Sequence, residues 1–265
     1  KESTHAIILA RGGSKGIKHK NLLKIKNKPL VYWSIINSIK SKKIDHTWVS
    51  SDSNKILNIS KKFGAKTIKR PKKFSGDKSS SEKAWAHAIN YIGKTHNIKT
   101  VVGIQPTSPI RAQNDFDRAL KIFKKNNFDS LFSSNRVYEN NIWKYKNGKL
   151  FSNYNFRKNR KRRQDLKQNY LENGSFWIFN AKKFLKYKRR LFGSIGKYEM
   201  SKKLLLNLSN GPLRHCIDWV LRPQLMNACR VYGLKDQKSV PSGLHSCDGC
   251  PAMDSQSIMR PPKDV

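Results

Sequence analysis

The sequence lacks any long hydrophobic run. Its longest apolar stretches, such as AIILA and LVYW, are far shorter than the roughly 18 to 20 residues that a membrane-spanning helix needs. The N-terminal residues also lack the pattern of a secretory signal. We therefore expect a soluble, cytoplasmic protein with no membrane partner. The run KNRKRR (158–163) would also be compatible with nuclear import.

Cysteine is scarce and occurs only in the last quarter of the chain, at Cys216, Cys229, Cys247 and Cys250. The Cys247-x-x-Cys250 pair, with His245 nearby, has part of the spacing of a zinc site. The first half of a regular zinc pattern is missing, so free thiols are the favoured interpretation.

Acidic residues are also few: 17 Asp and Glu oppose 55 Lys and Arg, for a net charge of +38. Such an excess is typical of nucleic-acid-binding proteins. Here residues 1–203 hold 48 basic and 12 acidic residues, or +36, whereas residues 204–265 hold 7 and 5, or +2. Lysine is spread through every segment together with Asn and Ile, which favours a compositional bias over a dedicated groove. A basic nucleic-acid-binding protein remains a less favoured alternative.

What the sequence does have is a repeated alternation of strand-like and helix-like segments. The 37% of hydrophobic residues suffices for a globular core. Strands are expected at 5–10, 46–51, 65–70, 100–104, 129–134 and 175–180, and helices at 29–43, 53–64, 79–94, 116–126 and 181–190. This order predicts an α/β fold with a doubly wound, mostly parallel sheet. Ligands of such sheets bind at the carboxyl ends of the strands.

Two regions depart from this alternation. Residues 136–172 contain a hairpin pattern around Asn147-Gly148 and a dense basic run, and are expected to form a projecting arm. From about Leu204 lysine becomes sparse and periodicity fades. We therefore divide the chain into a catalytic domain (1–203), with the arm inside it, and an atypical, poorly structured C-terminal tail (204–265). The abrupt change suggests that this tail was replaced or read out of frame.

The first predicted strand runs directly into ARGGSKGIKHKN, Ala10 to Asn21. This segment is neither a Walker A loop nor a dinucleotide-binding glycine motif, because both spacings are absent. Its three glycines would let the backbone approach a phosphate closely, and Arg11, Lys15 and Lys20 would supply positive charge. The segment therefore predicts a polyphosphate site at the end of the strand.

Several motifs occur here in the order typical of acylneuraminate cytidylyltransferases, and together they give a specific resemblance to that family. They are ILARGGSKGIKHKN, VSSD (49–52), FGAKTIKRP (63–71), GDKSSS (76–81), QPTSPIR (105–111) and RRQDLKQNYLENGSFWIF (162–179). The resemblance covers residues 5 to about 201. It implies a nucleotide-diphosphosugar-transferase-like fold and transfer of CMP from CTP to a nonulosonic acid, with release of pyrophosphate.

The resemblance also implies roles for particular residues. Arg11, Ser14, Lys15 and Lys20 would hold the triphosphate, with Lys20 also expected to act in catalysis, and Asn21, Arg70, Ser79 and Ser81 would hold the nucleotide. Gln105, Thr107, Ser108 and Arg111 would face the sugar acid. Arg162 and Arg163, expected to act in catalysis, would reach from the arm into the partner's site of a homodimer, and Gln164 beside them would bind the substrate.

The expected Mg²⁺ site is where this sequence departs from the family. The family carries an Asp-x-Asp pair shortly after the motif that appears here as Tyr198-Glu199-Met200. Asn207 and Ser209 occupy those positions, so the metal ligands cannot be assigned. The departure raises a second hypothesis, a nucleotide-binding homologue with impaired catalysis. Which nonulosonic acid is used stays open.

Overall fold

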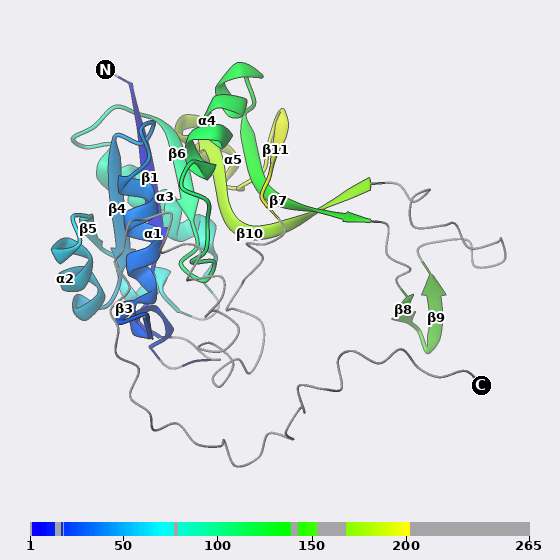
Figure 1. Ribbon diagram of the computed structural model, residues 1–265, viewed down its shortest axis with the longest axis horizontal. Helices are drawn as coiled ribbons and strands as arrows, with labels where there is room; N and C mark the ends of the chain where they lie inside the picture. Colours follow the sequence, from blue (N-terminus) through cyan, green and yellow to red (C-terminus); the bar gives the residue numbers. More distant parts are fainter. Residues whose placement is uncertain are drawn as a thin grey trace, which may run out of the picture. The chain divides into compact units, whose positions relative to one another are not determined.

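The computed structural model describes residues 2–13, 17, 19–76, 79–138, 143–152 and 168–201. Seven of its strands form one sheet in the order β11-β7-β10-β6-β1-β4-β5 (Figure 1). These strands are β1 (Ser3–Leu9), β4 (His46–Ser51), β5 (Lys66–Lys69), β6 (Ile98–Ile104), β7 (Ser130–Tyr138), β10 (Gln168–Asn180) and β11 (Ile195–Glu199). Only β10 runs antiparallel to its neighbours in this sheet. The predicted α/β, mostly parallel fold is confirmed.

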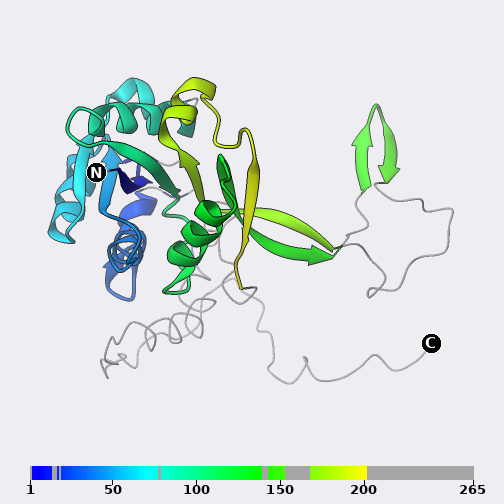
Figure 2. The same cartoon turned by 90° about the horizontal axis from the view of Figure 1, so that it is seen from above.

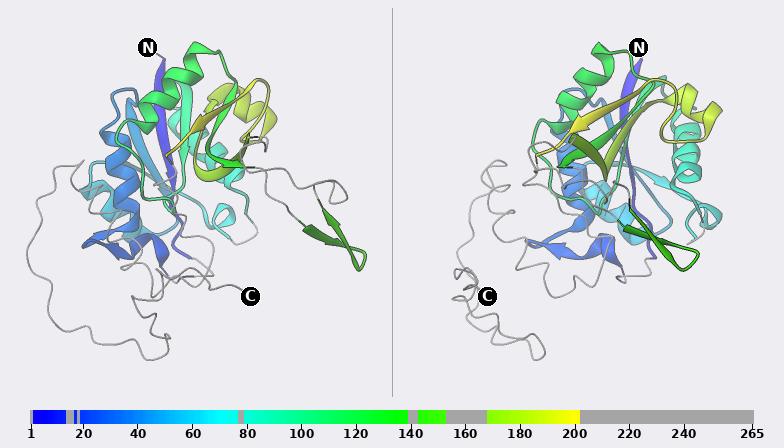
Figure 3. Two further views of the ribbon diagram at one scale, coloured as in Figure 1. Left: turned by 45° about the vertical axis from the view of Figure 1, so that its right-hand side comes forward. Right: turned by 90° about the vertical axis from the view of Figure 1, so that its right-hand side faces the viewer.

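Five α-helices cover both faces of the sheet (Figure 3). They are α1 (Leu30–Ile39), α2 (Asn54–Lys62), α3 (Ser81–Ile92), α4 (Asp115–Lys125) and α5 (Ala181–Tyr187). The described residues also form two short 3₁₀ turns, η1 (Lys20–Leu22) and η2 (Lys72–Phe74). Two small two-stranded sheets pair β2 (Lys24–Ile25) with β3 (Lys28–Pro29) and β8 (Trp143–Lys146) with β9 (Lys149–Ser152).

The alternating residues of β1 divide the core into two clusters. Ile8 packs in the cluster that contains apolar residues of α1, α2 and α4. Its neighbour Ile7 points into the other cluster, with Trp85 of α3 and Phe184 of α5. Successive side chains of a strand face opposite sides of a sheet, so a run such as HAIIL can supply both layers at once. Continuous apolar strands are therefore what this fold requires.

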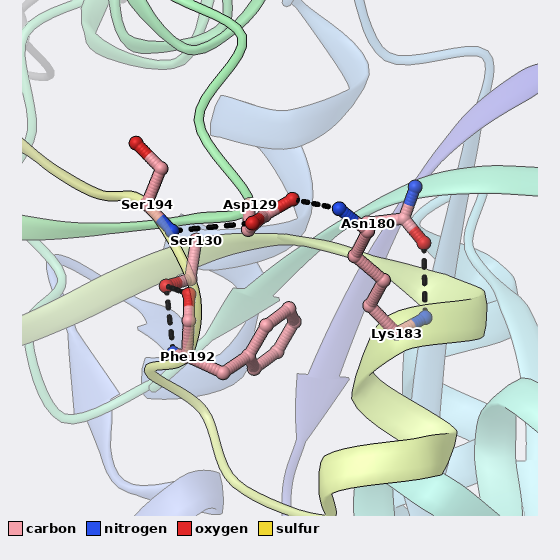
Figure 4. A network of polar contacts seen from close by, with 6 residues as sticks. All are labelled: Asp129, Ser130, Asn180, Lys183, Phe192 and Ser194. Carbon is pink, nitrogen blue, oxygen red and sulfur yellow. Dashed lines mark hydrogen bonds and ion pairs between the residues drawn. The ribbon is translucent and has the colours of Figure 1, made fainter.

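The strand β11 was missed by the sequence analysis. It is short, has exposed residues at alternate positions and lies at the edge of the sheet, parallel to β7. A polar network fixes the chain that enters it (Figure 4). The Ser194 amide donates to the Asp129 carboxylate at 3.1 Å, and the Asn180 amide donates to the Asp129 carbonyl at 3.1 Å. Lys183 also pairs with Asp129.

The base of the predicted arm is a continuation of the sheet. The β7–β10 pairing extends to Tyr138 and Gln168, and this ribbon projects beyond the other strands (Figure 2). The hairpin predicted around Asn147-Gly148 is present as β8 and β9, with both turn residues at positive φ as a tight hairpin turn requires. Residues 139–142 and 153–167, on either side of this hairpin, and residues 202–265 lie outside the described part of the chain.

Candidate active site

The backbone that leaves β1 is tied to the end of β4. The Ala10 amide donates to the Ser50 carbonyl at 3.1 Å, and the Gly12 amide donates to the Asp52 carboxylate at 2.8 Å. A Cβ on Gly12 would lie 2.9 Å from the Cβ of Ser53, so a larger residue would push the loop away from the strand. Gly12 is thus required for close backbone packing at this point.

The cationic side chains of Arg11, Lys20 and Arg70 lie near one another, close to the point where Gly12 is bound to Asp52. Burial lowers the pKa of Lys20, and the neighbouring Arg11 lowers it further. Burial likewise lowers the pKa of Arg70, which is only 4% exposed; Asp52 opposes this shift and Arg11 adds to it. Cations that are held close together in a desolvated site favour the arrival of an anion. The arrangement is suited to a phosphate chain.

A cavity of about 320 Å³ opens at this place, on the carboxyl edge of the sheet. Arg11, Arg70 and Gln105 follow directly or closely on the parallel strands β1, β5 and β6. The residues of the sequence prediction that line the cavity are Arg11, Lys20, Asn21, Arg70, Ser79, Ser81, Gln105 and Thr107. Segments far apart in the chain therefore meet where a doubly wound sheet binds its ligands.

Two hydroxyl groups of the cavity lining are buried without a hydrogen-bond partner in the described part of the chain. They are Ser79 Oγ and Thr107 Oγ1. A buried hydroxyl without a partner is costly, and proteins retain such groups mainly where a ligand or water completes the bond. The two hydroxyls are thus positioned to contact a bound molecule.

Ser108 and Arg111 do not line this cavity. Arg111 is 2% exposed, and its guanidinium donates to Ser175 Oγ at 2.9 Å and to the carbonyls of Gln105 and Ser175. It also donates to Ser34 Oγ of α1 at 3.2 Å. Arg111 therefore links β10 and α1 to the residue that follows β6 through these hydrogen bonds. Direct contact of Ser108 or Arg111 with a sugar acid stays a prediction that the fold does not favour.

The remaining predicted residues cannot be placed. Ser14, Lys15, Arg162, Arg163, Gln164, Asn207 and Ser209 lie outside the described residues. Other lining residues were not predicted: Leu9, Phe74, Ser75, Gly76, Ser80, Ala84 and Pro106. Ser80 and Pro106 are direct neighbours of predicted residues, and Ser75 accepts a hydrogen bond from Arg70 Nε at 2.9 Å. Leu9, Gly76, Ser80 and Pro106 lie within the motifs quoted above, and that was the signal that could have identified them.

The described residues do not form a protein-only metal site. Among them, no group of three or more His, Cys, Asp or Glu residues is placed to hold an ion. Asp52 is the carboxylate at the cationic cluster, and it accepts the Gly12 amide. Asp52 alone therefore does not fit a Mg²⁺ ion that depends on several protein ligands.

No helix in the described ranges is long and apolar enough to span a membrane.

The family model described as Cytidylyltransferase matches residues 5–221. The chain belongs to the cytidylyltransferase family. The match extends past residue 204 and includes positions 207 and 209, so the family relationship reaches further than the expected limit near residue 201.

Curated cytidylyltransferases show similarity over much of this family member. The N-acylneuraminate cytidylyltransferase of Oncorhynchus mykiss is 31% identical over 252 residues, covering 92% of this chain and 55% of that protein. The pseudaminic acid cytidylyltransferase of Campylobacter jejuni is 30% identical over 184 residues, covering 68% of this chain and 79% of that protein. The chain thus spans about half the length of the fish relatives that it matches.

Solved structures of other cytidylyltransferase-type enzymes share the fold. A CMP:2-keto-3-deoxy-manno-octonic acid synthetase, solved with CTP, has a TM-score of 0.58 at 13% identity and covers 88% of this chain and all of that one. A 4-diphosphocytidyl-2C-methyl-D-erythritol synthase has a TM-score of 0.60 at 11% identity and covers 85% of this chain and all of that one. These similarities confirm the nucleotidyltransferase-type fold.

Proposed function

We propose that this protein transfers CMP from CTP to an acylneuraminic acid or a related nonulosonic acid. The observation that carries the proposal is the cavity at the carboxyl edge of the sheet, where Arg11, Lys20 and Arg70 come together with Ser79 and Thr107. The hydroxyls of these two residues have no hydrogen-bond partner among the described residues. Family membership supplies the chemistry, and relatives named for acylneuraminic and pseudaminic acids supply the acceptor class.

In this reaction the anomeric oxygen of the sugar acid bonds to the α-phosphorus of CTP. The bond from that phosphorus to the bridging oxygen breaks, pyrophosphate leaves, and the hydroxyl proton is released. Arg11 and Lys20 hold the phosphate chain and neutralise charge on its oxygens, which is the main protein contribution in phosphoryl transfer. Arg70, Ser79 and Ser81 bind the nucleoside end, and Gln105 and Thr107 orient the acceptor.

A metal ion would add charge neutralisation at the phosphates when bound. CTP brings its own phosphate oxygens as Mg²⁺ ligands, and Mg²⁺ retains water molecules readily, so it can enter with the nucleotide. We expect a Mg²⁺ requirement, with Asp52 as the described carboxylate at the cationic cluster. The role of the arm is also a proposal: Arg162 and Arg163 would complete the site of a partner in a homodimer.

The replacement of the family's aspartates by Asn207 and Ser209 favours a second candidate function. Without those charges, the protein would bind CTP but turn it over slowly. Pyrophosphate release from CTP with Mg²⁺, measured across a panel of nonulosonic acids, separates the two candidates. Turnover with one acid supports the transferase. CTP-specific thermal stabilisation without turnover supports the impaired homologue.

A third outcome would reject both candidates. If CTP neither stabilises the protein nor releases pyrophosphate, the cavity does not bind this nucleotide. Steeply salt-dependent binding of DNA or RNA would then favour the basic nucleic-acid binder instead. UTP serves as the matched control for the nucleotide, because it carries the same triphosphate and differs at the base.

A further inference from the structure

One wall of the nucleotide cavity is built by the start of α3. Ser79, Ser80, Ser81 and Ala84 all line the cavity. Ser80 is the N-cap of the helix, and its Oγ accepts a hydrogen bond from the Lys83 amide at 3.3 Å. A second part of the lining, Gln105 to Thr107, follows β6 and is called the β6 wall below. The width of the cavity thus depends on how α3 is held against the sheet.

Arg190, from the segment after α5, contacts this first turn of α3 from outside the cavity. Its Nε lies 2.7 Å from Glu82 Oε1, and the two side chains are only 28% and 21% exposed. Burial raises the pKa of Glu82, but the hydrogen bond from Arg190 and the bonds to nearby backbone outweigh this, so the pKa is lowered. Glu82 is therefore charged and held, one residue after Ser81.

The guanidinium of Arg190 also packs against the sheet. Its central carbon lies 4.6 Å from the ring centre of Trp177 on β10 and 5.5 Å from that of Trp85 on α3. Trp177 pairs with Gly103 of β6, and a Cβ on Gly103 would lie 2.7 Å from the Trp85 ring. The planar cation therefore joins α3 to β10, the strand that pairs with β6.

We propose that Arg190 is a positioning residue for the nucleotide: through Glu82 it sets the distance between the α3 wall and the β6 wall of the cavity. Arg190 is not part of the cavity lining, so its proposed effect on the nucleotide is indirect. The inference rests on the proposed function, because it assumes that CTP occupies this cavity. No sequence motif indicated it, since Glu82 and Arg190 are separated by more than a hundred residues.

The test compares Arg190→Gln with Arg190→Lys and the wild-type protein. For Arg190→Gln we expect the Kd and KM for CTP to rise by about five- to tenfold, the effect of losing a partly buried charged hydrogen bond, with the KM for the sugar acid unchanged. Arg190→Lys should recover part of this loss, because it keeps the charge but not the planar contact with Trp177. A merely structural role would lower thermal stability without this selective effect on CTP.

Lys99→Gln is the matched control, because it removes the partner of Glu2 in an exposed ion pair. If Arg190→Gln fails to fold, Glu82→Gln replaces it, since that change leaves the guanidinium on the tryptophan rings. Folded variants that bind CTP as tightly as the wild type would overturn the inference and leave the proposed function intact. A wild-type protein that does not bind CTP would instead reject both.

Discussion

The side-chain amide of Asn21 donates a hydrogen bond to the backbone carbonyl of Arg11 at 2.9 Å. Asn21 is 7% exposed and lies on η1, ten residues further along the chain. This bond joins the two ends of the glycine-rich segment, while the Gly12 amide holds its start to Asp52. The position of Arg11 over the cavity is thus determined by backbone contacts on both sides.

The first prediction concerns Arg11. Arg11→Ala should weaken CTP binding by about 1.5–3 kcal/mol, because one charge-assisted contact is lost. The backbone contacts that hold the loop remain, so thermal stability without ligand should change little. Isothermal titration with CTP measures the effect, and Lys99→Ala is the control for loss of one positive charge. Unchanged CTP affinity in folded Arg11→Ala would refute the assignment of Arg11 to the triphosphate.

A second prediction separates backbone strain from steric collision at Gly193. Gly193 has φ +60°, and a Cβ there would lie 2.1 Å from the Asp129 carboxylate. Gly64 has φ +84° but would meet only ordinary contact with Ile39. Gly64→Ala should therefore destabilise the protein by about 1 kcal/mol from backbone strain alone. Gly193→Ala should cost about 1–3 kcal/mol more, because the crowded carboxylate must move.

Urea unfolding of both glycine variants at the same pH gives the comparison. Gly193→Ala should also weaken the Asp129 contacts that anchor the entry to β11. Equal losses of stability in the two variants would show that Asp129 moves aside at little cost.

The third prediction is an acid-sensitive stability centred on His5. Its side chain is fully buried, and its Nδ1 accepts a hydrogen bond from Trp48 Nε1 at 3.0 Å. Burial first, and then His46, His96 and Lys66, lower the pKa of His5 to about 4, although Asp45 opposes the shift. Neutral His5 therefore stabilises the fold above the unfolded pKa of about 6.5, and this stability is lost as the pH falls toward 4.

Urea unfolding between pH 7.5 and 4.5 measures this effect. We expect His5→Gln, whose amide oxygen can still accept from Trp48, to reduce the loss of stability by about 2–3 kcal/mol over this range. His87→Gln is the comparison at a second histidine whose pKa burial lowers, and it should reduce the loss of stability by less than His5→Gln. If the wild-type protein and His5→Gln lose stability in parallel, another group is responsible.

The fourth prediction concerns action of the arm across a dimer. A subunit with Arg162→Ala and Arg163→Ala, mixed with an Arg11→Ala subunit, should regain part of the activity. One site of the hybrid then combines an intact Arg11 with an intact arm. Activity is measured after heterodimers are verified by differential tags. No recovery in verified heterodimers would indicate that the arm acts within its own subunit.

The fifth prediction concerns metal dependence. Removing Mg²⁺ with EDTA should abolish turnover more completely than CTP binding, because orientation at the α-phosphate suffers most. Replacing both Asn207 and Ser209 with Asp should raise turnover if those positions follow the course of the family. The single variant Ser209→Asn, which leaves Asn207 in place, is the uncharged control. Full activity of the unaltered chain would show that the aspartate charges are dispensable here.

Much of the fold follows from local patterns. The apolar run around Ile7 and Ile8 specifies a strand buried on both faces, and Gly64 ends α2 because it supplies the positive φ that other residues resist. The edge strand β11 was missed because an exposed strand needs few apolar residues, and its position depends on pairing with β7. Local sequence carries little information about such pairing.

The same division holds for the site. The segments that carry polar and cationic groups at the site could be identified from the sequence, since the residues after each parallel strand must meet at one edge of the sheet. The use of each group depends on contacts that form only in the folded chain. It turns Arg111 inward, where four hydrogen bonds satisfy a buried guanidinium, and it brings Arg190 onto Trp177 and Glu82. Arg111 and Arg190 carry the same charge, so their different roles follow from their burial and from the distant residues that they contact.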